Sequence, residues 1–457
     1  ESVVLTSLAF VLALVLVEAA LPAFRELTGD AIYLPYGSVL FWGVMAGYVL
    51  FTGLLAGSRP AFYLSAFRPV RVLKGKIVAG RAATWPRRVL VTLQFAASVG
   101  LIVTTVIIYQ QIQYAKDRPT GFDTRRLVMS DVSPDVQKNY PVIKQELLQS
   151  GLVSAVTKSS SRVTSYSEGD DVDEWPGKLP GETLGLALTA VSDADYFKTM
   201  GMSFSSGRNF SGNLATDTLA VILNEMAVKK MRLKVPLGQT ITWNKTQKVK
   251  VIGVVKDAMI GSPYAAAEPA MYLYDPGYAH VVTYRIAPNV PTAKAIAGFT
   301  ALFNKYNPSY PYMYRFVDKS YEAKFGMETL IGRLAGIFAG LAIFISCLGL
   351  FGLAAYVAEQ RTKEIGVRKV LGASVGQVWV LLSKDFVVLV LTGVVLATPV
   401  SLYFLRQWLQ QFDYRIAISP WVFLGAGLAA LAITVGVVSL QAIRAALMNP
   451  VAALRSE

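Results

Sequence analysis

A basic, amphipathic stretch, EQRTKEIGVRKVLGAS at residues 359–374, lies between two apolar runs and restricts what this chain can become. The runs cover residues 334–357 and 386–405, and each is long enough to cross a bilayer as a helix, which takes roughly 20 apolar residues. A charged segment between two membrane helices must lie at a membrane surface, and its surplus of Lys and Arg favours the cytoplasmic side. We therefore expect a short cytoplasmic helix at about residues 359–376.

Four more apolar runs accompany these two. The chain of 457 residues is 53% hydrophobic and only 16% charged, whereas soluble domains carry about 25% charged residues. The sequence predicts an α-helical polytopic membrane protein with six transmembrane helices and a polar domain inserted between the third and fourth. The predicted spans are residues 3–23, 38–56, 89–110, 334–357, 386–405 and 421–442.

The orientation follows from the loop at residues 57–88, which holds eight basic residues and no acid. Because such loops stay in the cytoplasm, residues 111–333 are expected outside and residues 358–385 inside. The same topology explains the net charge of +14 without nucleic acid as a partner. The basic residues are Arg59, Arg68, Arg71, Lys74, Lys76, Arg81, Arg87 and Arg88.

The outer segment alternates strand-like and helix-like patches, which predicts an α+β domain of two subdomains. Strand–helix–strand units at both ends favour a split βαβ sheet with an inserted subdomain. A segment rich in Ser, Gly and acids, residues 159–182, is expected to be a mobile loop or a partner-facing edge. Strands are predicted at 127–132, 155–158, 185–191, 219–223, 249–255, 270–273, 281–286 and 312–317, and helices at 139–148, 193–200, 225–231 and 292–306.

A short motif occurs twice, as RPVRVLK at residues 68–74 and as NPVAALR at residues 449–455. Each copy follows a pair of predicted spans, so spans one and two resemble the end of one repeat and spans three to six a complete second repeat. A first repeat built like the second would need more sequence before residue 1. We expect this chain to be the C-terminal part of a longer two-repeat protein. The alternative is a first repeat that is supplied by another polypeptide or is absent.

With the preceding SCLGLFGLAA (346–355), the 359–374 stretch resembles the permeases of MacB/FtsX-type (type VII) ABC transporters. DYFKTMGM (195–202), SGRNF (206–210), VILNE (221–225) and VIGVVKD (251–257) resemble the outer domain of that family. The resemblance implies five parts. They are 1–57, the last two membrane helices of a first permease repeat; 58–88, a basic cytoplasmic linker; 89–110, a membrane helix; 111–333, a MacB-like periplasmic core domain; and 334–457, an FtsX-like membrane domain.

The inner helix is the candidate site for coupling to a cytoplasmic ATPase. Val367, Val370, Leu371, Ser374 and Val378 follow helical spacing and predict one apolar or small face, with basic residues free to pair with acids of a motor subunit. Gly366 and Gly372 are expected to allow close backbone approach. The alternative is an ordinary juxtamembrane helix on anionic lipid. The candidate residues are Glu359, Arg361, Lys363, Glu364, Gly366, Arg368, Lys369 and Gly372.

Glycines at four-residue spacing mark two of the spans, and such spacing lets membrane helices pack closely. Internal packing is the simpler expectation, and a sliding or dimer contact is the sharper one. The glycines are Gly43, Gly47, Gly53, Gly57, Gly332, Gly336 and Gly340.

Several classes of protein are disfavoured. A single cysteine, Cys347, excludes an intrachain disulfide, and a single histidine, His280, disfavours a histidine metal site or a Ser-His triad. Glu18, within the first span, and Arg333, beside the fourth, are the only candidate membrane charges and both lie near an outer boundary, which disfavours a proton- or ion-coupled transporter. No stretch matches G-x-x-x-x-G-K-[ST], so the chain is expected to bind no cofactor itself and not to be an enzyme.

The resemblance then implies a permease subunit in the bacterial cytoplasmic (inner) membrane. Its partners would be ABC ATPase subunits that use ATP and Mg, a second permease repeat in a dimer or pseudo-dimer, membrane lipid, and an outer adaptor, lipoprotein or hydrolase. The expected role is export or efflux of peptides, antibiotics or lipoproteins. The alternative is a signalling scaffold that activates a cell-wall hydrolase and transports nothing.

Overall fold

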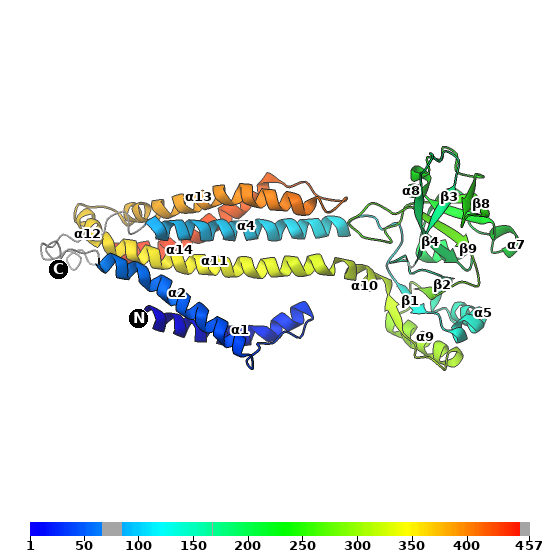
Figure 1. Cartoon of the computed structure of the whole chain (residues 1–457), viewed down its shortest axis with the longest axis horizontal. Helices are drawn as coiled ribbons and strands as arrows, with labels where there is room; N and C mark the ends of the chain where they lie inside the picture. Colours follow the sequence, from blue (N-terminus) through cyan, green and yellow to red (C-terminus); the bar gives the residue numbers. More distant parts are fainter. Residues whose placement is uncertain (66–84, 167, 448–457) are drawn as a thin grey trace. The chain divides into compact units, whose positions relative to one another are not determined.

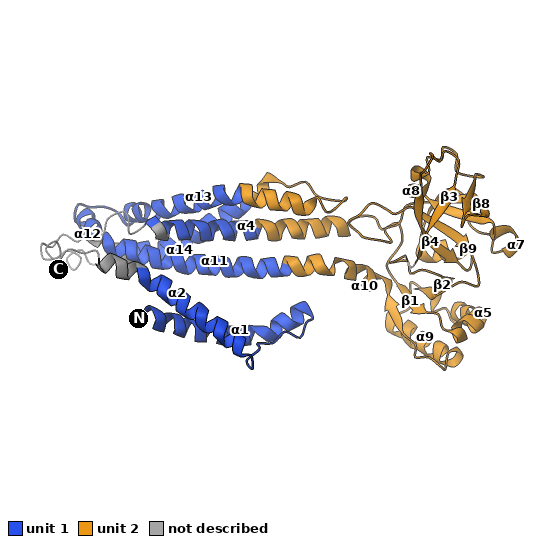
Figure 2. Ribbon diagram, viewed as in Figure 1, with its two compact units in different colours: residues 1–102, 333–398, 424–457 blue, residues 103–332, 399–423 orange. Residues whose placement is uncertain are grey.

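The computed structural model describes residues 1–65, 85–166 and 168–447 (Figure 1). The chain forms two compact units (Figure 2). Unit 1 comprises Glu1–Ile102, Arg333–Thr398 and Leu424–Glu457, and unit 2 comprises Val103–Gly332 and Pro399–Phe423.

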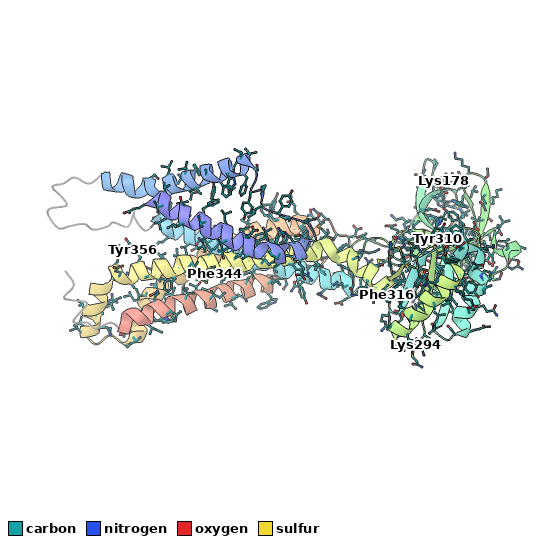
Figure 3. The ribbon with its side chains drawn as sticks, turned by 90° about the horizontal axis from the view of Figure 1, so that it is seen from below. Lys178, Lys294, Tyr310, Phe316, Phe344 and Tyr356 are labelled. Atoms are coloured by element: carbon teal, nitrogen blue, oxygen red, sulfur yellow. The ribbon has the colours of Figure 1, made fainter. Side chains whose placement is uncertain are left out.

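Within the described ranges, six helices are long and apolar enough to cross a membrane. Their surfaces carry exposed apolar side chains, such as Phe344, which is 61% exposed on α11 (Figure 3), and lipid is the solvent that such a surface requires. The predicted fold class, a six-span protein with an inserted α+β domain, is confirmed. The helices are α1 (Ser2–Thr28), α2 (Val39–Ser65), α4 (Trp85–Lys116), α11 (Gly326–Gln360), α13 (Val375–Leu409) and α14 (Pro420–Leu447).

Each helix is longer than the apolar run from which it was predicted. An apolar run marks only the part of a helix inside the bilayer, and the helix continues beyond it in more polar turns. Helix α2 thus continues to Ser65, into the segment predicted as linker. The rest of that linker, residues 66–84, lies outside the described residues, and so do both copies of the repeated motif, 68–74 and 449–455.

The first outer subdomain is a four-stranded antiparallel sheet covered by two helices, in the order β11-β1-β10-β2. Strand β10 lies between β1 and β2, and β1 lies between β10 and β11, so both strand–helix–strand units are split as predicted. Both helices bury aromatic and aliphatic side chains in one core, with Tyr284 and Phe299 completely buried. The elements are β1 (Leu127–Asp131), α5 (Pro134–Gln149), β2 (Val153–Ser159), β10 (Val281–Ile286), α9 (Thr292–Tyr306) and β11 (Tyr314–Phe316).

The second outer subdomain is a closed ring of six strands in the order β4-β3-β7-β8-β6-β9, in which β9 returns to pair with β4. Its interior holds a separate apolar core that includes Val221, Val251 and Met271. Closure leaves the ring without a free edge. The elements are β3 (Glu168–Glu174), β4 (Leu184–Val191), α6 (Tyr196–Met200), β5 (Phe204–Gly207), α7 (Leu214–Asp217), β6 (Ala220–Asn224), α8 (Glu225–Lys230), β7 (Thr240–Trp243), β8 (Gln247–Val255) and β9 (Ala270–Tyr274).

The segment at residues 159–182, predicted as a mobile loop or a partner-facing edge, contains a strand that was not predicted, and a partner on it stays a prediction. Strand β3 lies in this segment and pairs with both β4 and β7. Val172 is the one buried residue of this strand, and its acidic neighbours are exposed or half-buried. A strand with a single inward apolar residue among acids lacks the alternation that predicts strands from sequence.

Lys144 joins the two subdomains near the point where β2 meets β4. Its ammonium donates to Asp193 Oδ2 at 2.9 Å and to Asp195 Oδ2 at 2.7 Å. Burial alone would lower the pKa of Lys144, but these two carboxylates outweigh it and hold the pKa above its ordinary value. The clamp fixes the start of the DYFKTMGM motif to α5.

Candidate coupling helix and outer junction

The inner turn consists of α12 (Thr362–Val370) between α11 and α13. Gly372 adopts φ +91°, its N–H donates to Lys369 O at 3.0 Å, and the N–H of Ala373 donates to Arg368 O at 2.9 Å. These bonds form a Schellman motif, which requires a left-handed residue after the helix. Gly372 is therefore present for its backbone conformation and not for close approach, since a Cβ there would meet nothing within 4 Å.

A capping box begins α13. The N–H of Gln377 donates to Ser374 Oγ at 3.3 Å, and the N–H of Ser374 donates to Gln377 Oε1 at 3.0 Å. The pattern Ser-x-x-Gln before an apolar run is typical of a helix start. Helix α13 accordingly begins at Val375, 11 residues before the predicted span at residue 386. The predicted helix at 359–376 therefore ends early, at Val370.

The predicted single apolar face is wrong, because the Gly372 turn separates its members. Val378 is buried on α13, where it packs with Ile365, Leu382 and Ala442. Ser374 is exposed at the start of α13, and the three aliphatic members before the turn are exposed as well. Val367 is 49% exposed, Val370 66% and Leu371 81%.

Two of the basic residues are paired within the chain. Asp385 Oδ2 accepts from Arg361 at 3.2 Å and from Arg88 at 3.4 Å, which joins α13 to the ends of α11 and α4. Arg361 was expected to contact a motor subunit. In the structure it pairs with Asp385, which the following helix, α13, places beside it. Arg368 pairs with Glu364 at 2.8 Å across one helical turn and stays half exposed.

The remaining candidates are distributed around the turn. Glu359 and Lys369 both take part in contacts within the chain. Gly366 is buried, and the side chain of Lys363 lies outside the described residues. Glu364 lies in the first turn of α12, where the helix dipole favours an anion as predicted.

A hollow of about 610 Å³ opens beside the exposed apolar residues. It combines aliphatic, small and cationic lining groups. The lining residues are Arg368, Leu371, Gly372, Ala373, Gln377 and Val378.

The predicted packing glycines divide into two groups. Gly53 and Gly57 lie against Val3 and Ser2 of α1. Gly332 lies 3.1 Å, measured from a built Cβ, from Ile108 on α4. A Cβ at Gly43, Gly47 or Gly340 would meet no atom of the described residues within 4 Å, so the expected internal packing is not seen there. A contact with another chain stays a prediction for these three and for Gly336.

A second group of contacts, within unit 2, ties membrane helix ends to the outer domain. Gln111 on α4 is completely buried; its Nε2 donates to Tyr414 O at 2.8 Å and its Oε1 accepts from the Ile416 N–H at 3.0 Å. The N–H of Tyr414 in turn donates to Tyr264 O at 2.9 Å in the loop between β8 and β9. One amide therefore holds the loop between α13 and α14, and that loop holds the outer domain.

Aromatic side chains fill this outer junction. Tyr414 stacks on Tyr114 at 4.4 Å between ring centroids, and the Arg118 guanidinium lies 4.4 Å over the Tyr414 ring. Arg118 also donates to Ala265 O at 2.6 Å. Tyr264 packs on Phe412 at 4.8 Å. These residues were not predicted from the sequence. The signal that could have indicated them is the polar Gln111 at the end of an apolar run, followed by Tyr114 and Arg118.

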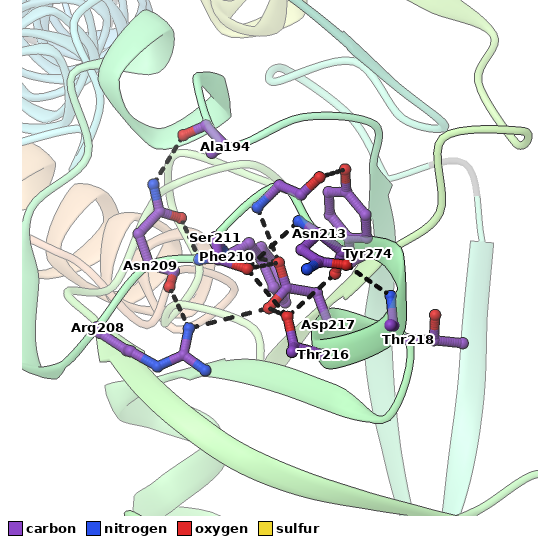
Figure 4. Close-up of polar contacts among 12 residues, drawn as sticks. Ala194, Arg208, Asn209, Phe210, Ser211, Asn213, Thr216, Asp217, Thr218 and Tyr274 are labelled. Carbon is purple, nitrogen blue, oxygen red and sulfur yellow. Dashed lines mark hydrogen bonds and ion pairs between the residues drawn. The ribbon is translucent and has the colours of Figure 1, made fainter.

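The SGRNF motif folds around a buried acid. Asp217 Oδ2 accepts from the N–H groups of Ser211 and Gly212 and from the Ser211 hydroxyl, at 2.7–2.9 Å (Figure 4). Arg208 lies 3.8 Å from the same carboxylate. The motif therefore shapes a loop, and no group of three or more His, Cys, Asp or Glu suited to a metal is found among the described residues.

Comparison with known proteins identifies the two parts of the chain. Residues 89–302 match the model of the MacB-like periplasmic core domain, and residues 336–450 match that of the FtsX-like permease C-terminal family. The macrolide export ATP-binding/permease protein MacB of Neisseria meningitidis is 25% identical over 293 residues, which covers 60% of this chain and 44% of the relative. This chain therefore spans less than half of that protein.

Two further proteins are similar to this chain. The uncharacterized ABC transporter permease YknZ of Bacillus subtilis is 25% identical over 313 residues, or 60% of this chain and 71% of YknZ. Among solved structures, the periplasmic region of MacB from Actinobacillus actinomycetemcomitans is 16% identical, with a TM-score of 0.33 over 46% of this chain and 96% of that one.

Proposed function

Since this chain belongs to the ABC-transporter permeases with an FtsX-like membrane domain and a MacB-like periplasmic core, we propose that it transmits the motion of a cytoplasmic ATPase to its outer domain. The bacterial inner membrane is the site of action. ATP and Mg belong to the partner ATPase, because this chain contains no phosphate-binding loop.

The exposed apolar tip of the inner turn is the observation that carries this proposal. Leu371 and Val370 are exposed beside a hollow, at the end of helix α12, in which Val367 is half exposed and Ile365 is buried. An apolar residue at the centre of an interface, surrounded by polar groups such as Arg368, is the usual anchor of a protein contact. The internal pairing of Arg361 leaves this tip as the part of α12 that an ATPase subunit contacts.

Motion then travels along continuous helices. Helix α4 runs unbroken from Trp85 to Lys116, and α11 runs unbroken from Gly326 to Gln360. The outer junction adds a third route, because Gln111 ties the α13–α14 loop to α4 and that loop bonds to the outer domain. Work is done outside the membrane on an exported peptide, antibiotic or lipoprotein, and the export named for the MacB relative supports this choice.

The test is capture of the cognate ATPase by the purified full-length chain in detergent. We expect Leu371→Asp to weaken capture tenfold or more, because it removes apolar burial of roughly 1.5–3 kcal/mol and buries an unpaired charge. Leu219→Asp, the same change at an exposed position of the outer domain, should leave capture unchanged. Normal capture by the Leu371 variant, or ATP hydrolysis by the chain alone, would contradict the proposal.

A further inference from the structure

A hollow of about 270 Å³ lies where α13 ends and the following loop begins, entirely within unit 2. Its lining combines aliphatic side chains with two cationic ones and one amide. The aliphatic residues are Leu402, Leu409, Ile416 and Ile418, the cationic ones are Arg406 and Arg415, and the amide is Gln410.

The two guanidinium groups have no acidic partner among the residues that the structure describes. Within residues 1–65, 85–166 and 168–447, neither Arg406 nor Arg415 forms an ion pair. The nearest acid in sequence, Asp413, accepts the N–H of Ala266 at 3.3 Å. Two planar guanidiniums beside one hollow present paired donors that match the oxygens of a phosphate group.

The surroundings place this hollow at the edge of a bilayer. Arg406 lies in the last turn of the 35-residue apolar helix α13, and α14 begins 14 residues later at Pro420. Tyr403, Phe404 and Trp421 are exposed on these helix ends, as in the aromatic belts of membrane proteins. The loop also bonds to the outer domain through Tyr414, which puts this edge on the outer side.

We propose that the hollow binds an anionic phospholipid of the outer leaflet, with its phosphate on Arg406 and Arg415 and an acyl chain along Leu402 and Leu409. Inorganic phosphate would use the arginines but not the aliphatic wall, so the lining favours the lipid. The bound lipid stabilises the outer junction, because the loop that carries Arg415 is the one that Gln111 holds. This site is independent of the coupling function and of any ATPase.

Native mass spectrometry of the purified full-length chain, with equal amounts of phosphatidylglycerol and phosphatidylcholine, tests the proposal. We expect phosphatidylglycerol to be retained at least tenfold better by the wild type, and the Arg406→Gln, Arg415→Gln double variant to lose that preference. The control variant Arg333→Gln removes an exposed charge at the outer end of α11, away from the hollow. It should keep the preference for phosphatidylglycerol. The double Lys variant keeps both charges without the planar forks and should show an intermediate preference.

Circular dichroism and thermal unfolding without added lipid would verify that each variant is folded. If the double Gln variant does not fold, the double Lys variant decides, because an unchanged preference there would overturn the role of the guanidinium pair. A wild type without preference, or a preference that survives in a folded double Gln variant, would also overturn the proposal. Displacement of the lipid by 10 mM inorganic phosphate would assign the site to free phosphate instead.

Discussion

The inner turn and the outer junction are built on opposite principles. At the inner turn the chain satisfies its backbone with two local motifs and leaves Val370 and Leu371 exposed. At the outer junction long-range contacts join separate segments of the chain, through the buried Gln111 amide and the stacked Tyr114 and Tyr414 rings. The difference indicates that the outer junction is held mainly by contacts within the chain, whereas the exposed inner surface fits our proposal that a partner covers it. Substitutions should therefore affect partner binding at one and stability at the other.

The largest effect is expected at Gln111. Gln111→Leu removes two hydrogen bonds and leaves Tyr414 O and the Ile416 N–H without their partner, which should cost about 3 kcal/mol. Thermal unfolding in detergent, followed by tryptophan fluorescence, should show a fall of several degrees in Tm. Gln110→Leu makes the same change at the exposed neighbouring position and should shift Tm little. Equal shifts for the two variants would show that the junction is not held by this amide.

Substitution of Asp385 should have the next largest effect. The effect should fall mainly on the proposed coupling between the ATPase and the outer domain. Asp385→Ala leaves Arg88 and Arg361 without their shared carboxylate, but because all three side chains are about a third or more exposed, stability should fall by only about 1 kcal/mol. With the ends of α4 and α11 released from α13, ATPase should still be captured while transport falls severalfold. Asp385→Glu, which keeps the carboxylate, should recover most of the transport. Loss of capture together with transport would assign Asp385 to the binding surface itself.

The same contrast explains what the sequence could predict. The spans and the split βαβ units were predicted from local patterns of apolar, strand-like and helix-like residues. The end of α12 was not predicted, although the Gly372 turn that ends it is also a local feature. The pairing of Arg361 with Asp385 and the fit of Gln111 to residues more than 300 positions away depend on tertiary contacts. The acid-rich strand β3 needed closure of the six-strand ring to become stable, and no local pattern contains that information.

Ser374 tests whether the inner turn is stabilised locally. Ser374→Ala removes the hydroxyl that caps α13, which typically costs about 1 kcal/mol. Because the capping box is local, the loss should appear as fraying of the first turn of α13, measured as faster hydrogen exchange at residues 375–378. Ser58→Ala, which changes a serine within a helix and not at a cap, should leave that exchange unchanged. Protection equal to wild type would mean that packing of Val378, and not the cap, fixes the helix start.

The smallest structural effect is expected at Arg368, where the comparison is sharpest. Its ion pair with Glu364 is half exposed and spans one helical turn, so Arg368→Gln should change stability by no more than about 0.5 kcal/mol. If the inner surface is incomplete without its partner, the same change should still weaken ATPase capture several-fold, because Arg368 lines the hollow beside Leu371. Glu364→Gln is the matched control, since it breaks the same ion pair from the acidic side and leaves the cation in place. Capture that falls equally in both variants would show that the pair matters only for the shape of α12, whereas capture lost in the Arg368 variant alone identifies the guanidinium as a contact with the motor.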